Sequence, residues 1–245
     1  MAEVYLGSCP RSRVARKLAL AVGLTLGLGL SIPAPPAHAV TIGFDCITDN
    51  SPGDCAIGAA QLSVEVTAGP GANQVLFTFN NVGGSASSIA DVYFDDGTLL
   101  GISALRDKDD SIIALGGLGH AGVDFTSGGA SPPNLPGANN ASPPFQVTAG
   151  FLADSDSPTQ PNGVNPGEYL QIVFNLQAGK TFADTLNALA LAGAAGGLRI
   201  GIHVQGFGSG GSESFVNAPV PEPGTALLVS LGLSGLLLRR RSSVR

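Results

Sequence analysis

Residues 61–68, with the sequence QLSVEVTA, are the stretch that decides the fold class. The apolar residues Leu62, Val64 and Val66 alternate there with polar ones. Successive side chains of a β-strand point to opposite faces, so this alternation makes one face apolar and the other polar. The stretch therefore predicts a strand of an antiparallel sheet that turns one face to the core and the other to water.

The same period of two recurs along the chain, between clusters of glycine and proline that end each run. Clear further strands are predicted at Val75–Asn80, Tyr169–Leu176 and Leu198–Gln205. Weaker candidates are Val40–Phe44, Ile89–Phe94, Leu99–Leu105 and Phe145–Thr148. Many short strands with such spacing predict an all-β fold, an antiparallel β-sandwich of the jelly-roll or immunoglobulin-like kind.

One short helix is predicted after residue 180. Thr181 is a capping residue with Asp184 three positions later, and Phe182, Leu186 and Leu189 follow at helical spacing. Two long segments, Ser127–Pro144 and Asp154–Gly167, are rich in Pro, Asn, Gly and Ser and are predicted to be loops.

The N-terminal residues 1–39 have the three parts of a secretory signal peptide. A basic region, Arg11–Lys17, precedes the apolar run Leu18–Ile32, and the segment ends in Ala37-His38-Ala39. The alternative, a transmembrane helix, is disfavoured because the apolar run has only 15 residues and a proline cluster follows it. We expect cleavage before Val40.

Two cysteines, Cys46 and Cys55, stay in the chain after the signal is removed. An even pair in an oxidising compartment predicts a disulfide, with a turn between the two residues. A zinc half-site or a redox pair fits less well, because there is no C-x-x-C motif and no histidine nearby.

Charge limits the partners of the folded part. Residues 40–219 hold four basic and sixteen acidic side chains, a formal charge of −12. So acidic a surface repels phosphate backbones, which makes nucleic acid an unsuitable partner. Calcium or a neutral polymer such as a polysaccharide stays open.

Acidic clusters give weak candidates for metal ligands, and calcium is the one cofactor considered. Calcium takes six to eight oxygen ligands, and no cluster matches the twelve-residue calcium loop. Solvated turn residues are the simpler interpretation. The candidates are Asp91, Asp95, Asp96, Asp107, Asp109 and Asp110.

No catalytic constellation is found, and the chain is not expected to be an enzyme. Residues 117–122 match G-x-G-x-x-G, but the following residues do not read as the helix that this dinucleotide motif needs. His203 lies on the polar face of its predicted strand, where an exposed histidine is the default interpretation. A secreted hydrolase is kept as the least favoured alternative.

The C-terminal segment, residues 218–245, has three parts in order. The motif Val220-Pro221-Glu222-Pro223 precedes fifteen uncharged residues, Gly224–Leu238, and then the basic end 239–245 with Arg239, Arg240 and Arg241. As a helix the uncharged run would span about 22 Å, a marginal membrane crossing. The arginines would stay in the cytoplasm and stop the chain in the membrane.

These residues resemble the PEP-CTERM sorting signal. The resemblance implies that an exosortase, an integral-membrane transpeptidase-like enzyme, recognises Val220–Pro223 and removes the tail. It also implies a link to exopolysaccharide and biofilm matrix. We therefore expect an exported protein that is anchored in the inner membrane in transit and then reaches the cell surface or the medium.

For the domain spanning residues 40–217 we expect a structural or adhesive role in the matrix. A calcium- or glycan-binding module is the alternative.

Overall fold

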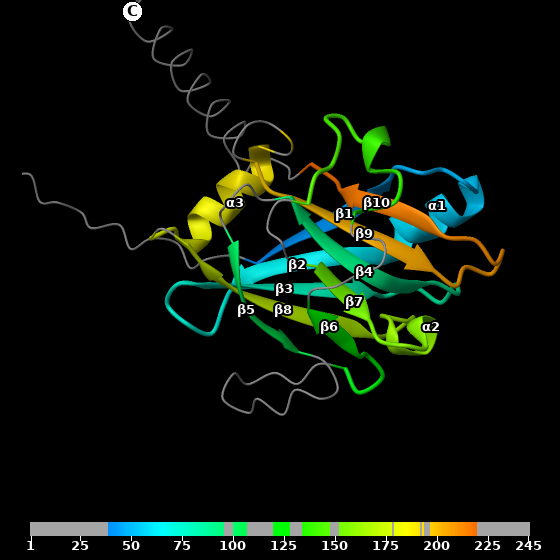
Figure 1. Cartoon of the computed structure of the whole chain (residues 1–245), viewed down its shortest axis with the longest axis horizontal. Helices are drawn as coiled ribbons and strands as arrows, with labels where there is room; N and C mark the ends of the chain where they lie inside the picture. Colours follow the sequence, from blue (N-terminus) through cyan, green and yellow to red (C-terminus); the bar gives the residue numbers. More distant parts are fainter. Residues whose placement is uncertain are drawn as a thin grey trace, which may run out of the picture. The chain divides into compact units, whose positions relative to one another are not determined.

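The fold is mostly β, and the ten strands found among the described residues form one antiparallel sheet with short helices (Figure 1). The computed structural model describes residues 39–95, 100–106, 120–127, 134–147, 152–177, 179–191, 193 and 197–219. The strands are β1 (Val40–Cys46), β2 (Leu62–Ala68), β3 (Gln74–Asn81), β4 (Ser88–Asp95), β5 (Leu100–Arg106), β6 (Phe125–Ser127), β7 (Leu152–Ser155), β8 (Tyr169–Leu176), β9 (Arg199–Gln205) and β10 (Glu213–Asn217).

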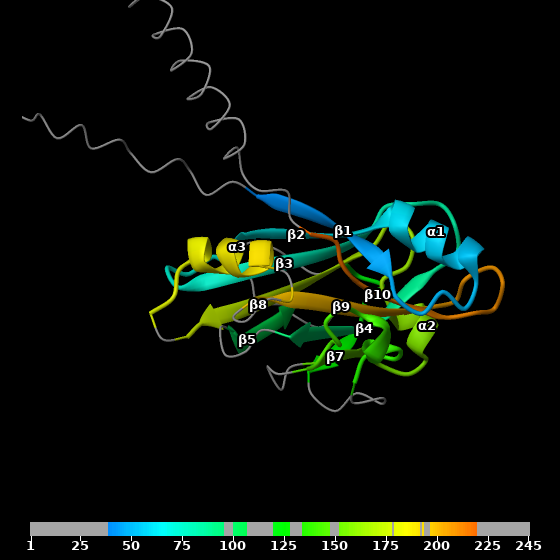
Figure 2. The ribbon, with the colours of Figure 1, turned by 90° about the horizontal axis from the view of Figure 1, so that it is seen from above.

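Strand β1 joins the two halves of this sheet. The strand order is β5-β8-β3-β2-β1-β10-β9-β4-β7-β6. Residues 40–43 of β1 pair with β2, and residues 44–46 pair with β10. The prediction of a sandwich of two separate sheets is therefore wrong in its connectivity, because one strand crosses from one half to the other and the sheet curls on itself (Figure 2).

The two halves of the curled sheet share one main core. Phe94 of β4 lies 5.2 Å from Phe77 of β3 and 4.7 Å from Phe174 of β8, measured between ring centroids, and both pairs meet edge to face. Edge-to-face aromatic pairs of this kind add to the free energy of area burial. The inward faces predicted for β2, β3, β8 and β9 all lie in this core, which confirms the assignment of face from period two.

The other face of β4, β9 and β10 is also buried, which the alternating pattern did not predict. A second, smaller core covers it, formed by Tyr93, Leu135, Phe145, Leu152 and Val216. Leu135 and Phe145 belong to residues 134–147, which were predicted to be mostly loop. This segment therefore covers a sheet face that was expected to be wet.

Helix α3 (Phe182–Leu191) is the helix that the sequence predicted, and its cap is as expected. Thr181 donates to Asp184 through its backbone N–H at 2.7 Å and its hydroxyl at 2.8 Å. These two hydrogen bonds, the backbone one first, hold the pKa of Asp184 below its ordinary value. Phe182, Leu186 and Leu189 then pack against the main core.

The prediction of a single helix is wrong, because the described residues also contain α1 (Pro52–Gln61), α2 (Thr159–Asn162) and the 3₁₀ turn Ala138–Asn140. Helix α1 replaces the turn expected between the cysteines. Asn50-Ser51-Pro52-Gly53 reads as a turn, but Ser51 is also a suitable cap and Pro52 a suitable first helical residue. Figure 2 shows α1 beside β1 and α3 beside β3.

Further differences concern short strands. Strands β6, β7 and β10 were not predicted, and residues 145–147 form no strand. Among the described residues no helix is long and apolar enough to cross a membrane. The predicted signal peptide, apart from Ala39, and the tail from Val220 onward lie outside the described residues.

Candidate functional site

The disulfide between Cys46 and Cys55 confirms the predicted pairing. The S–S distance is 2.04 Å and the two Cα atoms are 5.4 Å apart. Cys46 ends β1 and Cys55 lies in the first half of α1, so the bond fixes this helix to the middle of the sheet.

A buried carboxylate, Glu213 at the start of β10, lies beside this disulfide and is 1 % exposed. It accepts hydrogen bonds from the Thr48 hydroxyl, from the backbone N–H of Asn50 at 3.0 Å and from that of Ser51 at 2.6 Å. These bonds orient the chain that enters α1. An isolated buried charge is costly, and three hydrogen bonds to the carboxylate offset that cost.

Cys46, Cys55 and Glu213 also form the one group of potential metal ligands that is close enough among the described residues. Both sulfurs are bonded to each other, and only thiolates bind metals. The carboxylate oxygens are already occupied by the donors described above. This cluster therefore stabilises the fold and is not suited to hold a metal.

A row of polar residues crosses the covered face of the sheet. His203 of β9 is paired in register with Asp91 of β4 on one side and with Ser214 of β10 on the other. The His203 Nδ1 lies 3.0 Å from Asp91 Oδ2, and both residues are buried. An ionised carboxylate can only accept, so Nδ1 carries the proton in this bond. The expectation of an exposed histidine is wrong.

Serine, histidine and aspartate in one row are the residue types of a nucleophilic triad. The Ser214 Oγ, however, is buried and has no hydrogen-bond partner among the described residues. A nucleophile needs a hydrogen bond to its base and access to substrate. The row therefore lacks the geometry of a triad, and its side-chain hydrogen bond between His203 and Asp91 links β9 to β4.

Tyr93, next to this row on β4, has a pKa raised above its ordinary value. Burial is the main cause, and the negative charges of Asp91 and Asp154 add to it. The phenol therefore stays neutral at any physiological pH.

Asp95, the second described calcium candidate, forms an ion pair with Arg199 of β9. Arg199 also donates to the backbone oxygens of Pro143 and Pro144 and places its guanidinium 5.3 Å from the centroid of the Phe145 ring. The structure thus pairs both Asp91 and Asp95 with cationic or donor side chains and does not bring them to a shared site. Asp96, Asp107, Asp109 and Asp110 lie outside the residues whose side chains the structure describes.

The end of the G-x-G-x-x-G match is described and leads into a strand. Gly122 lies in a turn, and β6 begins at Phe125. A dinucleotide motif needs a helix at this point to hold the pyrophosphate. His120, at the start of the turn, lies against Tyr169 with 5.7 Å between ring centroids.

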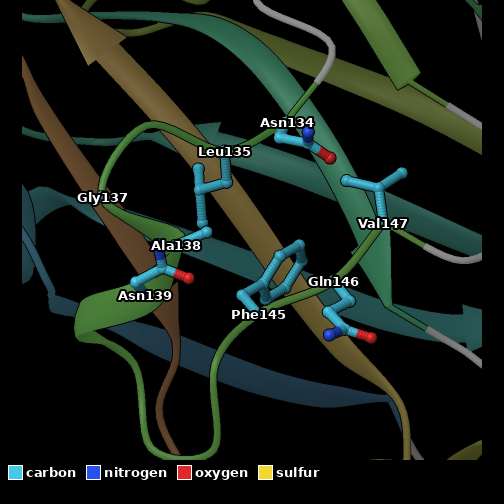
Figure 3. A pocket seen from close by; sticks show the side chains of 8 residues that line it. All are labelled: Asn134, Leu135, Gly137, Ala138, Asn139, Phe145, Gln146 and Val147. Atoms are coloured by element: carbon cyan, nitrogen blue, oxygen red, sulfur yellow. The ribbon is translucent and has the colours of Figure 1, made fainter.

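A hollow is found over β9 and β4, within the segment that covers this sheet face. Its volume is about 550 Å³, and Figure 3 shows Leu135 and Phe145 between Asn139 on one side and Asn134 and Gln146 on the other. No charged residue lines it among the described residues. The sequence predicted a loop for most of this segment and carried no sign of a hollow.

The sorting tail starts from the middle of the sheet. The Ala218 N–H donates to the Gly43 oxygen of β1 at 2.9 Å, immediately after β10 ends. Two residues, Ala218 and Pro219, therefore separate the last strand from the Val220–Pro223 motif.

Comparison with known proteins identifies this tail. Residues 219–241 match the PEP-CTERM protein-sorting motif. The chain thus carries at its C-terminus a sorting motif that marks it as an exosortase substrate, and the predicted resemblance is confirmed. No curated protein and no solved structure gives a significant match to the chain.

Proposed function

We propose that this protein is a structural or adhesive component of the extracellular matrix, associated with exopolysaccharide and delivered by exosortase processing of its tail. The observation that carries the proposal is the sorting motif at residues 219–241, which implies export and processing. The matrix role of the domain is our extension of it.

The domain supports a non-catalytic role. The described acids that the sequence offered as ligands are engaged in bonds that hold strands or loops, as Asp91 is with His203 and Asp95 with Arg199. The serine beside that histidine is buried. A disulfide and a sheet of which β4, β9 and β10 are buried on both faces suit a module that must persist outside the cell.

The position of the tail supports processing after the domain has folded. Six residues, 218–223, connect β10 to the uncharged run, and an extended chain of that length reaches at most about 20 Å. The folded domain would therefore stay near the membrane until the tail is cut. Prolines on both sides of Glu222 disfavour a helix interior there, and extended chain is the form that a protease reads.

The test is mass spectrometry of protein released by a strain that has an exosortase. We expect a C-terminus upstream of Gly224, and a released chain that still ends at Arg245 would contradict processing. Replacement of Pro221-Glu222-Pro223 by alanines should leave the protein in the membrane fraction. Replacement of Ser242-Ser243 by alanines is the matched control and should be released normally.

A further inference from the structure

The hollow between residues 134–139 and 145–147 has the size of a ligand site. Its volume of about 550 Å³ lies within the range of roughly 300–1,000 Å³ that small-molecule sites occupy. It lies on the covered face of the sheet, over strands that are paired on both sides.

Hydrogen bonds and an ion pair hold the segments that line this hollow in place. Arg199 binds the carbonyl oxygens of Pro143 and Pro144, and it is itself fixed by its ion pair with Asp95. The Phe145 N–H donates to the Ala138 oxygen at 2.9 Å and so joins the two segments that line the hollow. A site that is fixed before binding loses less entropy when a ligand arrives.

Beneath the hollow, Leu135 and Phe145 pack closely against the sheet. A Cβ on Gly201 of β9 would lie 2.8 Å from Leu135 Cδ2 and 3.1 Å from Phe145 Cζ, so the glycine is what lets these two side chains approach the strand. Leu135 and Phe145 are 2 % and 4 % exposed. These two side chains therefore support the hollow from the sheet side, and the polar groups around them form most of the surface that a ligand would contact.

The rim carries three amides that are available to a ligand. Asn134, Asn139 and Gln146 are exposed, and their side chains make no hydrogen bond within the described part of the chain. Each amide offers two donor hydrogens and one acceptor oxygen. Three such groups around one hollow match a ligand with several hydroxyls.

The charge of the domain selects among such ligands. Residues 40–219 have a formal charge of −12, which disfavours anionic polymers such as uronic-acid chains. Peptides often bind by pairing with a free strand edge, and β9 and β4 below the hollow offer none. An uncharged saccharide fits both conditions.

We propose that this hollow binds one or two units of a neutral saccharide through Asn134, Asn139 and Gln146. The inference rests on the proposed matrix function and deepens it by naming the class of polymer that the domain would contact. The binding site itself depends only on the described residues and does not depend on tail processing.

The experiment is calorimetric titration of the full chain, purified in detergent. The probes are hexamers of glucose, galactose, mannose and N-acetylglucosamine, with hexagalacturonate as the charged probe and a Gly-Ser peptide as the polymer of another class. We expect at least one neutral hexamer to bind and the charged hexamer and the peptide not to bind. The double variant Asn139→Ala/Gln146→Ala should weaken binding at least about tenfold.

The matched control is Asn73→Ala, which removes an exposed amide from the turn between β2 and β3 and should bind as the parent does. No binding of any neutral hexamer, binding that the double variant leaves unchanged, or binding of the peptide alone would each overturn the saccharide site. Protein that is released normally but binds no hexamer would contradict this inference and leave the sorting proposal intact. Protein that binds but keeps its tail would do the reverse.

Discussion

Glu213 is the residue whose environment most affects local stability at the start of α1. Its carboxylate accepts three hydrogen bonds from residues 48–51, and it is fully buried. None of these partners is charged, so the bonds come from neutral donors that the fold brings to the carboxylate. Removing the charge should therefore destabilise the fold although the side chain keeps its shape.

Glu213→Gln should lower the free energy of unfolding by about 2 kcal/mol, because the new NH₂ group would face backbone N–H donors and leave a buried donor unpaired. Urea unfolding followed by circular dichroism measures this. Glu65→Gln, on the half-buried face of β2, is the matched control and should change stability by less than about 0.5 kcal/mol. Equal losses for the two variants would show that the hydrogen bonds of Glu213 do not contribute to the free energy of unfolding.

The raised pKa of Tyr93 predicts how the free energy of unfolding depends on pH in the alkaline range. Its pKa is raised in the fold, so the folded chain keeps a proton that the unfolded chain loses above about pH 10. The stabilisation is fully present below about pH 10 and falls as the pH rises further, toward the raised pKa. Tyr93→Phe has no such proton, so its unfolding free energy should fall less steeply from about pH 10 to 11.5.

The measurement is urea unfolding at about pH 8, 10 and 11.5 for both proteins. The values at pH 8 serve as the internal control, because they contain any loss from removing the hydroxyl itself. Parallel pH profiles for the two proteins would contradict the burial of a neutral phenol at Tyr93.

Among the elements, helix α1 shows how packing decides which residue a helix position can hold. Gly58 lies where α1 crosses Phe215 of β10, and a Cβ there would be 2.2 Å from Phe215 Cζ. Gly53, in the first turn of α1, has room for a Cβ, whose nearest neighbour would be Ser51 Oγ at 4.0 Å. The same substitution should therefore have opposite effects at the two glycines of one helix.

Gly58→Ala should destabilise the protein by about 1–3 kcal/mol, because the buried Phe215 ring has no room to move. Gly53→Ala should be neutral or stabilise by up to about 1 kcal/mol, since alanine is the better helix former. Thermal unfolding of both variants measures the difference. A stabilising Gly58→Ala would mean that α1 does not pack on β10 as described.

At the scale of the whole molecule, the first and last strands meet in the middle of the sheet. Strand β10 lies between β1 and β9, so it completes the connection between the two halves. The sheet therefore cannot be completed until residues 213–217 have been exported. The tail begins directly after β10. The strand that completes the fold and the sorting motif are therefore close together along the chain.

A chain ending at residue 212 should not fold, whereas one ending at 219 should, because only the longer chain contains β10. Both would start at Val40 and lack the tail. Circular dichroism and limited proteolysis compare them, and we expect a cooperative unfolding transition for residues 40–219 alone. Cooperative unfolding of residues 40–212 would show that the fold does not need β10.

The sequence alone determined those features that depend on neighbours along the chain. Period two located β2, β3, β8 and β9 and their inward faces, and the Thr181–Asp184 pair located the start of α3. An even cysteine count predicted the disulfide. The motif, the uncharged run and the arginines, in that order along the tail, predicted the sorting motif. Each of these signals is contained within a few residues or in a count.

Tertiary structure alone decided the single curled sheet, the covered outer face, the pairing of His203 with Asp91 and the hollow. His203 and Asp91 are 112 residues apart, and Glu213 is 162 or more residues from its partners. No local pattern carries such contacts. Alternation along β9 shows only that polar and apolar side chains point to opposite faces, so its polar face was predicted to be exposed. Whether water reaches that face depends on the position of residues 134–147 in space.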